Sequence, residues 1–109
     1  MPSEWDDDPG EDSETGVATE TRKKVEKPPL YKVLLHNDDY TSMDFVVFIL
    51  MSVFYKDEPT ARRIMLEVHN RGLGVAGVFT FEIAESKINK VTALARANDF
   101  PLLCTMEQE

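Results

Sequence analysis

The arrangement of apolar residues along the chain predicts three β-strands. The run from residue 30 to residue 36 is mostly apolar, which is typical of a buried strand. Residues 75–83 are rich in β-branched and aromatic side chains and predict a second strand, interrupted only by Ala76-Gly77. Pro101 breaks the element before it, and residues 102–106 predict the last strand.

Apolar residues three and four apart predict three helices, because this spacing places them on one helix face. Thr41 and Asp44 fit a capping box at the start of the first helix. The second begins at Asp57-Glu58-Pro59, since proline is tolerated in a first turn, and ends at Gly72. The expected helices cover residues 41 to about 54, 57–72 and 84–98. The order strand, helix, helix, strand, helix, strand indicates an α+β fold, a small sheet with helices on one face.

The charge is distributed unevenly along the 109 residues, whose net charge is −8. Residues 1–21 carry eight Asp or Glu and no Lys or Arg, whereas residues 22–109 carry twelve of each kind. We therefore expect a disordered acidic N-terminal extension over residues 1–28, in which only Trp5 is suited to docking, and one core domain over residues 29–109. Neither part offers a basic surface, which argues against nucleic-acid binding.

The remaining composition favours a cytoplasmic protein. No stretch approaches the ~20 apolar residues that span a bilayer, so we expect no membrane association. The acidic start lacks the features of a secretory signal. One cysteine, Cys104, excludes an internal disulfide framework and fits a reducing compartment.

The polar segment Asn37-Asp38-Asp39 follows the first predicted strand directly. Adjacent carboxylates repel each other and are stabilised by water or a cation. The same segment is also typical of a simple turn before a helix N-terminus, which favours negative charge. The sequence therefore predicts either a cation-binding strand end or a turn.

Two of the predicted helices carry apolar residues and a histidine at helical spacing. Met43 and Val46 share one helix face, and Met65, Val68 and His69 share a side of the next helix. If the two faces lie opposite each other, they form an apolar hole with polar groups at its mouth. Taken singly, such Met and Val positions are usually core, and such a histidine is usually a cap or a surface group.

From Tyr31 onward the sequence resembles the ClpS family, bacterial adaptors that hand substrates to the ClpA–ClpP protease. The resemblance lies in the stretches LYKVLLHNDDYTSMDFVVFIL, ARRIMLEVHNRG, GVFTFEIAESK and FPLLCTMEQE, which cover nearly all of residues 29–109. It implies a small three-stranded antiparallel sheet packed with three helices. It also implies an adaptor without enzymatic activity or cofactor, which binds proteins whose N-terminal residue is Phe, Leu, Tyr or Trp (N-degrons).

The resemblance also implies the site that binds the substrate's α-amino group. Asn37, Asp38 and His69 match the amine-binding positions, and Asp39 adds negative charge. An ammonium group has three donors, so the site must supply acceptors. His69 must therefore be neutral at one ring nitrogen.

A hydrophobic pocket is implied for the first side chain of the substrate. The matching positions are Leu35, Thr41, Met43, Val46, Met65, Val68 and Leu102. His36 borders this pocket at a position where the family usually has an apolar residue, which leaves the preference among Phe, Leu, Tyr and Trp open. Met43 matches a gate that crowds β-branched side chains, so Ile and Val are expected to be excluded.

Delivery to the protease is implied by a second set of positions. Glu82 and Lys87 match contacts with the ClpA N-terminal domain, although a solvated charge pair at a helix start explains them equally well. The extension lies outside the matching stretches; in the family such extensions engage the unfoldase pore and promote substrate transfer, and we expect this one to do so through its length and lack of structure. We expect the adaptor to act as a monomer.

Three alternatives remain open at the level of the sequence. Cys104 with His69 suggests a thiol hydrolase, although no third orienting group is evident. His36, Asp38, Asp39 and His69 are a legitimate metal-ligand set, and an interaction module with a metal site is the main competing function. A protein–protein module of ribosomal-stalk type, which has a similar fold, would not need a free peptide amine.

Overall fold

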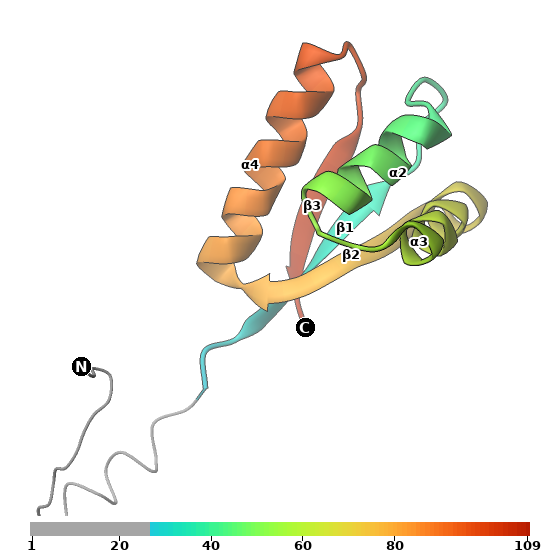
Figure 1. The fold of residues 1–109 in the computed structure, drawn as a ribbon. Coiled ribbons are helices and arrows are strands. Elements are labelled where there is room, and N and C mark those ends of the chain that lie inside the picture. The colour runs from blue at the N-terminus through green and yellow to red at the C-terminus, as the bar shows by residue number, and fades with distance from the viewer. Residues whose placement is uncertain (1–26) are drawn as a thin grey trace, which may run out of the picture.

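In the computed structural model of the chain, residues 27–109 are described; the expected extension, Trp5 included, lies almost wholly outside them. The elements are β1 (Leu30–His36), α2 (Met43–Ser52), α3 (Glu58–Arg71), β2 (Leu73–Thr80), α4 (Phe81–Ala97) and β3 (Leu103–Gln108). This order, drawn in Figure 1, confirms the predicted α+β fold. None of the described helices combines the length and the apolar character of a membrane span.

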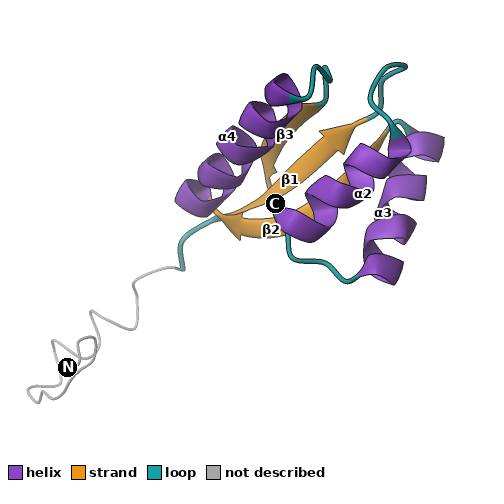
Figure 2. Ribbon diagram, turned by 45° about the horizontal axis from the view of Figure 1, so that its top comes forward, coloured by secondary structure: helices purple, strands orange, loops and turns teal. Residues whose placement is uncertain are grey.

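The sheet has β1 at its centre, with β2 and β3 antiparallel on either side. Side chains alternate along a strand, so Val33 and Leu35 are fully buried under the helices. The helices lie together on one face of the sheet (Figure 2). On the other face Leu103 is 55% exposed, because no described element covers it.

The hydrophobic core fills the space between the sheet and the three helices. Its largest fully buried side chains come from β1, from α2 with its C-cap Val53, and from α4: Leu35, Ile49, Leu50, Val33, Val53 and Val91. Burying such a side chain contributes ~1.5–3 kcal/mol. Helix α3 adds its buried residues Ala61, Ile64, Met65 and Val68 to the same core, and this shared packing holds α2 beside α3, on which the candidate site depends.

The start of α2 differs from the predicted capping motif by one residue. Ser42, not Thr41, is the N-cap, and its Oγ accepts a hydrogen bond of 3.1 Å from the Phe45 N–H. The Thr41 hydroxyl instead donates to the Asp38 carboxylate at 2.8 Å. Serine is the better N-cap residue of the two, and Thr41 is already engaged by Asp38 in the preceding turn.

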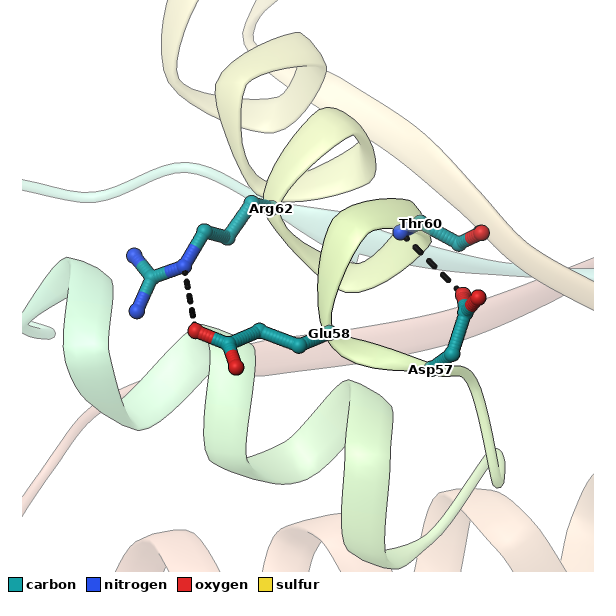
Figure 3. A network of polar contacts seen from close by, with 4 residues as sticks. All are labelled: Asp57, Glu58, Thr60 and Arg62. Atoms are coloured by element: carbon teal, nitrogen blue, oxygen red, sulfur yellow. Dashed lines mark hydrogen bonds and ion pairs between the residues drawn. The ribbon is translucent and has the colours of Figure 1, made fainter.

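Helix α3 begins and ends at the predicted residues. Asp57 accepts a hydrogen bond from the Thr60 N–H at 3.2 Å, and Glu58 pairs with Arg62 one turn later (Figure 3). The hydrogen bonding of Thr60 lowers the pKa of Asp57 from its ordinary value. Gly72 ends the helix with a φ of 92°, a conformation that glycine adopts without steric strain.

The boundary between β2 and α4 lies earlier than predicted. The strand covers Leu73–Thr80, and Phe81 already begins the helix. Phe81 and Ile83 are residue types that favour strands, which explains the prediction of a longer strand. In the structure the Phe81 ring packs edge-on against Tyr31, with ring centroids 5.4 Å apart. The last strand begins at Leu103 and continues to Gln108, two residues beyond the prediction.

Candidate functional site

A cleft of about 340 Å³ lies where β1 ends, between α2 and α3. This volume is at the low end of the ~300–1,000 Å³ typical of ligand pockets, and it fits a single side chain better than a large ligand. Its lining comes from two separate stretches of the sequence, residues 37–46 and 65–69: Asn37, Asp38, Asp39, Thr41, Met43, Val46, Met65, Val68 and His69.

The walls of the cleft are apolar. Val46 of α2 faces the cleft together with Met65 and Val68 of α3, and all three side chains are buried. Met43, in the first turn of α2, is 44% exposed. A methionine side chain is flexible, so Met43 is the wall residue best able to change position when a ligand enters.

The mouth of the cleft is polar. Asn37, Asp39 and His69 are exposed, and among residues 27–109 their side chains form no hydrogen bond. The Asn37 N–H donates to the Gly72 carbonyl at 2.8 Å. Since His69 lies in the last turn of α3, this backbone bond ties the end of β1 to the helix end that carries the histidine. Acceptor groups from both segments therefore surround the same opening.

Asp38 differs from its neighbours because its carboxylate is already hydrogen bonded. Oδ1 accepts from the N–H groups of Tyr40 and Thr41 at 2.8 and 2.7 Å, and Oδ2 accepts from the Thr41 hydroxyl at 2.8 Å. Burial raises the pKa of this carboxyl group. The hydrogen bonds from Thr41 and Tyr40 together lower the pKa by more than burial raises it, so the net pKa is below the ordinary value of 3.8. Asp38 therefore carries a full negative charge at neutral pH.

Three of the predicted pocket residues lie outside the cleft lining. Leu35 is fully buried in the core and pairs with Cys104 of β3. His36 points to the opposite face of the sheet, where its Nε2 lies 2.8 Å from the Thr105 Oγ1. Leu102 is buried beside a separate cavity between α4 and β3. Consecutive strand residues face opposite sides, so the side chains of Leu35 and His36 point to different faces of the sheet.

The geometry does not support the metal alternative or the hydrolase alternative. Within residues 27–109, no three His, Cys, Asp or Glu side chains are grouped so that they could hold a metal ion. His36 and His69 in particular belong to different surfaces. Burial raises the pKa of the Cys104 thiol to about 12, so no thiolate nucleophile is available near neutral pH.

The two residues predicted to contact ClpA have different environments on α4. Glu82 is exposed in the first turn. The Lys87 ammonium group instead donates to the Val53 carbonyl at 2.7 Å and lies 4.6 Å from the Tyr55 ring centroid and 5.6 Å from that of Phe79. They form no ion pair with each other; within residues 27–109 the recorded ion pair is that of Glu58 and Arg62.

Sequence reasoning missed the partners of Lys87. Val53 is 34 residues away along the chain, and no local pattern links the two. Tyr55, whose backbone has a positive φ of 56°, was also not identified. A non-glycine residue in this conformation has no reliable sequence signal.

The family model described as ATP-dependent Clp protease adaptor protein ClpS matches residues 26–105, and the chain belongs to this family. It is 59% identical over 102 residues to an ATP-dependent Clp protease adapter protein ClpS from Desulfatibacillum aliphaticivorans, covering 94% of this chain and 97% of that protein. The ClpS from Myxococcus xanthus is 55% identical over 98 residues, covering 88% and 92% of the two chains.

A solved structure of similar fold carries a ligand. The structure of Agrobacterium tumefaciens ClpS2 bound to L-phenylalaninamide matches with a TM-score of 0.74 and 44% sequence identity. The match covers 76% of this chain and all of that chain. L-phenylalaninamide has a free α-amino group and an aromatic side chain.

Proposed function

We propose that this ClpS-family chain binds the free α-amino group and the bulky N-terminal side chain of N-degron proteins, and delivers them to the ClpA unfoldase for degradation by ClpP. The observation that carries the proposal is one cleft with apolar walls and a polar, negatively charged mouth. Asp38 and Asp39 contribute negative charge there, and among residues 27–109 no lysine or arginine lines the cleft. Such a site suits a cation attached to an apolar group.

The α-ammonium group binds at the mouth of the cleft. The Asn37 side chain accepts one of its hydrogen bonds through the amide oxygen, and its NH₂ donates to the carbonyl of the peptide. His69 accepts a second through a neutral ring nitrogen, while Asp38 and Asp39 supply the negative potential. Hydrogen bonds to charged groups contribute ~1.5–3 kcal/mol each, so the amine provides a large share of the affinity.

The first side chain of the substrate enters between Met43 and Val46 on one side and Met65 and Val68 on the other. Burying a Phe or Leu side chain contributes ~1.5–3 kcal/mol. Met43 excludes β-branched side chains, because a branch at Cβ broadens the residue at the entrance of the cleft. The solved ClpS2 complex with L-phenylalaninamide supports this assignment, since that ligand pairs a free amine with a phenyl ring.

Delivery takes place on another part of the surface. The exposed Glu82 contacts the ClpA N-terminal domain, and Lys87 supports that surface from α4. The chain acts as a monomeric adaptor, and the segment preceding residue 29 assists transfer to the unfoldase. This surface lies on α4, and none of the residues that line the cleft belongs to that helix.

Peptide binding tests the recognition step. Four fluorescent peptides that differ only at the start, with Phe, Leu, Val or N-acetyl-Phe, are titrated with the full chain and followed by anisotropy. The Phe and Leu peptides are expected to bind, and the other two to bind roughly 100-fold more weakly or not at all. Equal binding of the acetylated peptide would favour a module of ribosomal-stalk type, which needs no free amine.

The delivery step is tested with a matched pair of variants. Glu82→Ala is expected to weaken binding to the isolated ClpA N-terminal domain, whereas Glu85→Ala, an exposed carboxylate one turn further on the same helix, leaves it unchanged. Both variants are expected to bind the Phe peptide as the parent chain does. Equal ClpA binding by the two variants excludes Glu82 as a contact.

A further inference from the structure

The turn between β1 and α2 is organised by one side chain. The Asp38 carboxylate accepts the N–H groups of Tyr40 and Thr41 and the Thr41 hydroxyl, at 2.7–2.8 Å. A carboxylate offers about four lone-pair positions, so roughly one is left for a ligand. By contrast, the side chain of the adjacent Asp39 forms no hydrogen bond within residues 27–109.

The turn connects the two halves of the cleft. On one side, the Asn37 N–H is held by the Gly72 carbonyl at 2.8 Å. On the other side, Ser42 caps α2, and Met43 follows as the first residue of the helix. Both Thr41 and Met43 line the cleft, so the position of its apolar entrance depends on the conformation of this turn.

We propose that Asp38 is a positioning residue, which holds Thr41 and Met43 in place and thereby determines which first side chains enter the cleft. This inference rests on the proposed function and adds to it a link between the amine-binding mouth and side-chain selectivity. A carboxylate that acted on the amine alone would change the affinity for all free-amine peptides by the same factor. Loss of a positioning residue also changes the ratio of the dissociation constants for peptides with different first side chains.

Three variants separate the charge of Asp38 from its hydrogen bonds. Asp38→Asn removes the charge, but its amide oxygen still accepts the two N–H groups and its NH₂ can donate to the Thr41 hydroxyl. Asp38→Ala removes both the charge and the bonds. Asp39→Ala is the matched control, because it removes a carboxylate from the same mouth without removing any of the hydrogen bonds that Asp38 forms in the turn.

The measurement is the dissociation constant of each chain for peptides that begin with Phe and with Val. The readout is the ratio of the two constants, which a uniform loss of charge leaves unchanged. Asp38→Ala is expected to reduce the preference for Phe over Val by roughly tenfold, the size of effect that small changes in pocket shape produce. Asp38→Asn and Asp39→Ala are expected to keep the parent ratio within about twofold, even where they weaken both peptides.

If Asp38→Ala keeps the parent ratio of the dissociation constants for the Phe and Val peptides, the inference is overturned, and the role of Asp38 is limited to its negative charge. If Asp38→Ala does not fold, Thr41→Val takes its place, since it removes the hydroxyl bond alone at similar size and is expected to reduce the ratio in the same direction. Failure of the proposed function is distinguishable, because the parent chain would then not bind the Phe peptide at all. That result overturns both proposals, whereas an unchanged ratio overturns only the second.

Discussion

The two ends of α2 differ in how their polar groups are paired. At the N-terminal end the helix borders the cleft, where the side chains of Asn37 and His69 form no hydrogen bond within residues 27–109. At the C-terminal end the Val53 carbonyl accepts a hydrogen bond from Lys87. The first region is open to solvent, so its polar groups are hydrated until a ligand replaces the water. The second is packed under aromatic rings, where an unpaired carbonyl would be costly. In the proposed function, similar polar groups thus serve ligand recognition at one end of α2 and stability at the other.

The charges at the two ends of α2 also differ. Asp38 and Asp39 place negative charge near the N-terminus of α2, and the Lys87 ammonium group lies at its C-terminus. Both arrangements are favourable to the helix dipole. At the N-terminal end both carboxylates also line the cleft, and this is the basis of the proposal that a cation binds there.

Asn37→Ala is expected to produce the largest change in ligand affinity with little change in stability. It removes an exposed side chain that forms no hydrogen bond within residues 27–109, so the free energy of unfolding stays within about 0.5 kcal/mol of the parent. The Phe peptide loses hydrogen bonds to a charged group, worth ~1.5–3 kcal/mol, which weakens binding by about 10- to 150-fold. Anisotropy titration and urea unfolding measure the two quantities on one sample. Unchanged affinity would remove Asn37 from the amine site.

His69→Ala is expected to weaken binding at the cleft. It removes the ring nitrogen that accepts a hydrogen bond from the ammonium group, worth ~1.5–3 kcal/mol, so the affinity for the Phe peptide should fall by about 10- to 150-fold. His69→Gln, whose amide oxygen can still accept a hydrogen bond, should lose less affinity than His69→Ala. Anisotropy titration of the two variants measures this, and parent-like affinity of His69→Ala would remove His69 from the amine site.

Lys87→Ala is expected to lower the free energy of unfolding and leave the ligand affinity unchanged, the opposite of Asn37→Ala. It leaves the Val53 carbonyl without its partner and removes the cation from the C-terminal end of α2, which costs ~1–3 kcal/mol of stability. Lys90→Ala, an exposed lysine on the same helix, is the control and should stay within about 0.5 kcal/mol. Urea unfolding measures both, and the Phe peptide should bind each variant as it binds the parent. Parent-like stability of Lys87→Ala would contradict the structural role assigned to this lysine.

The smallest expected effect is on the stability contributed at the two ends of α2, by Asp38 and by Lys87, in strong acid. The pKa of Asp38 is lowered in the folded chain, so its stabilising contribution is present above the ordinary value of 3.8 and is lost as the pH falls through the lower folded value. The stability difference between the parent and Asp38→Ala should therefore be constant at neutral pH and shrink below pH 3.8. The difference caused by Lys87→Ala should persist, because the partner of Lys87 is the Val53 backbone carbonyl and not a carboxylate. Urea unfolding at several pH values tests this, and a constant Asp38 difference would contradict it.

Much of the fold could be predicted from local sequence. The order of the six elements agrees with the structure, and so do the two cap positions of α3, Asp57 and Gly72, because caps and periodicity act within a few residues. The errors lie where two local interpretations compete. Thr41 and Ser42 both suit the N-cap, and the strand-forming residues Phe81 and Ile83 belong to α4.

The candidate site was predictable in part. The Asn37–Asp39 segment, the Met and Val positions of both helices and His69 lie around one cleft, as the spacing and the family resemblance indicated. Leu35, His36 and Leu102 do not line it. Resemblance identifies which positions lie near a site, but the direction of a side chain depends on the strand alternation and on the partners that the rest of the chain provides.

By itself the sequence determined the elements, their order, the family and the segments that meet at the cleft, because these follow from short-range periodicity and from matched motifs. Only the tertiary structure decided which polar groups were already engaged. His36 reaches Thr105 across 69 positions and Lys87 reaches Val53 across 34, and even the nearby bonds of Asp38 depend on a turn fixed at both ends. The physical reason is that hydrogen-bond partners are selected by packing in space, so the same charged residue serves binding or stability according to what surrounds it.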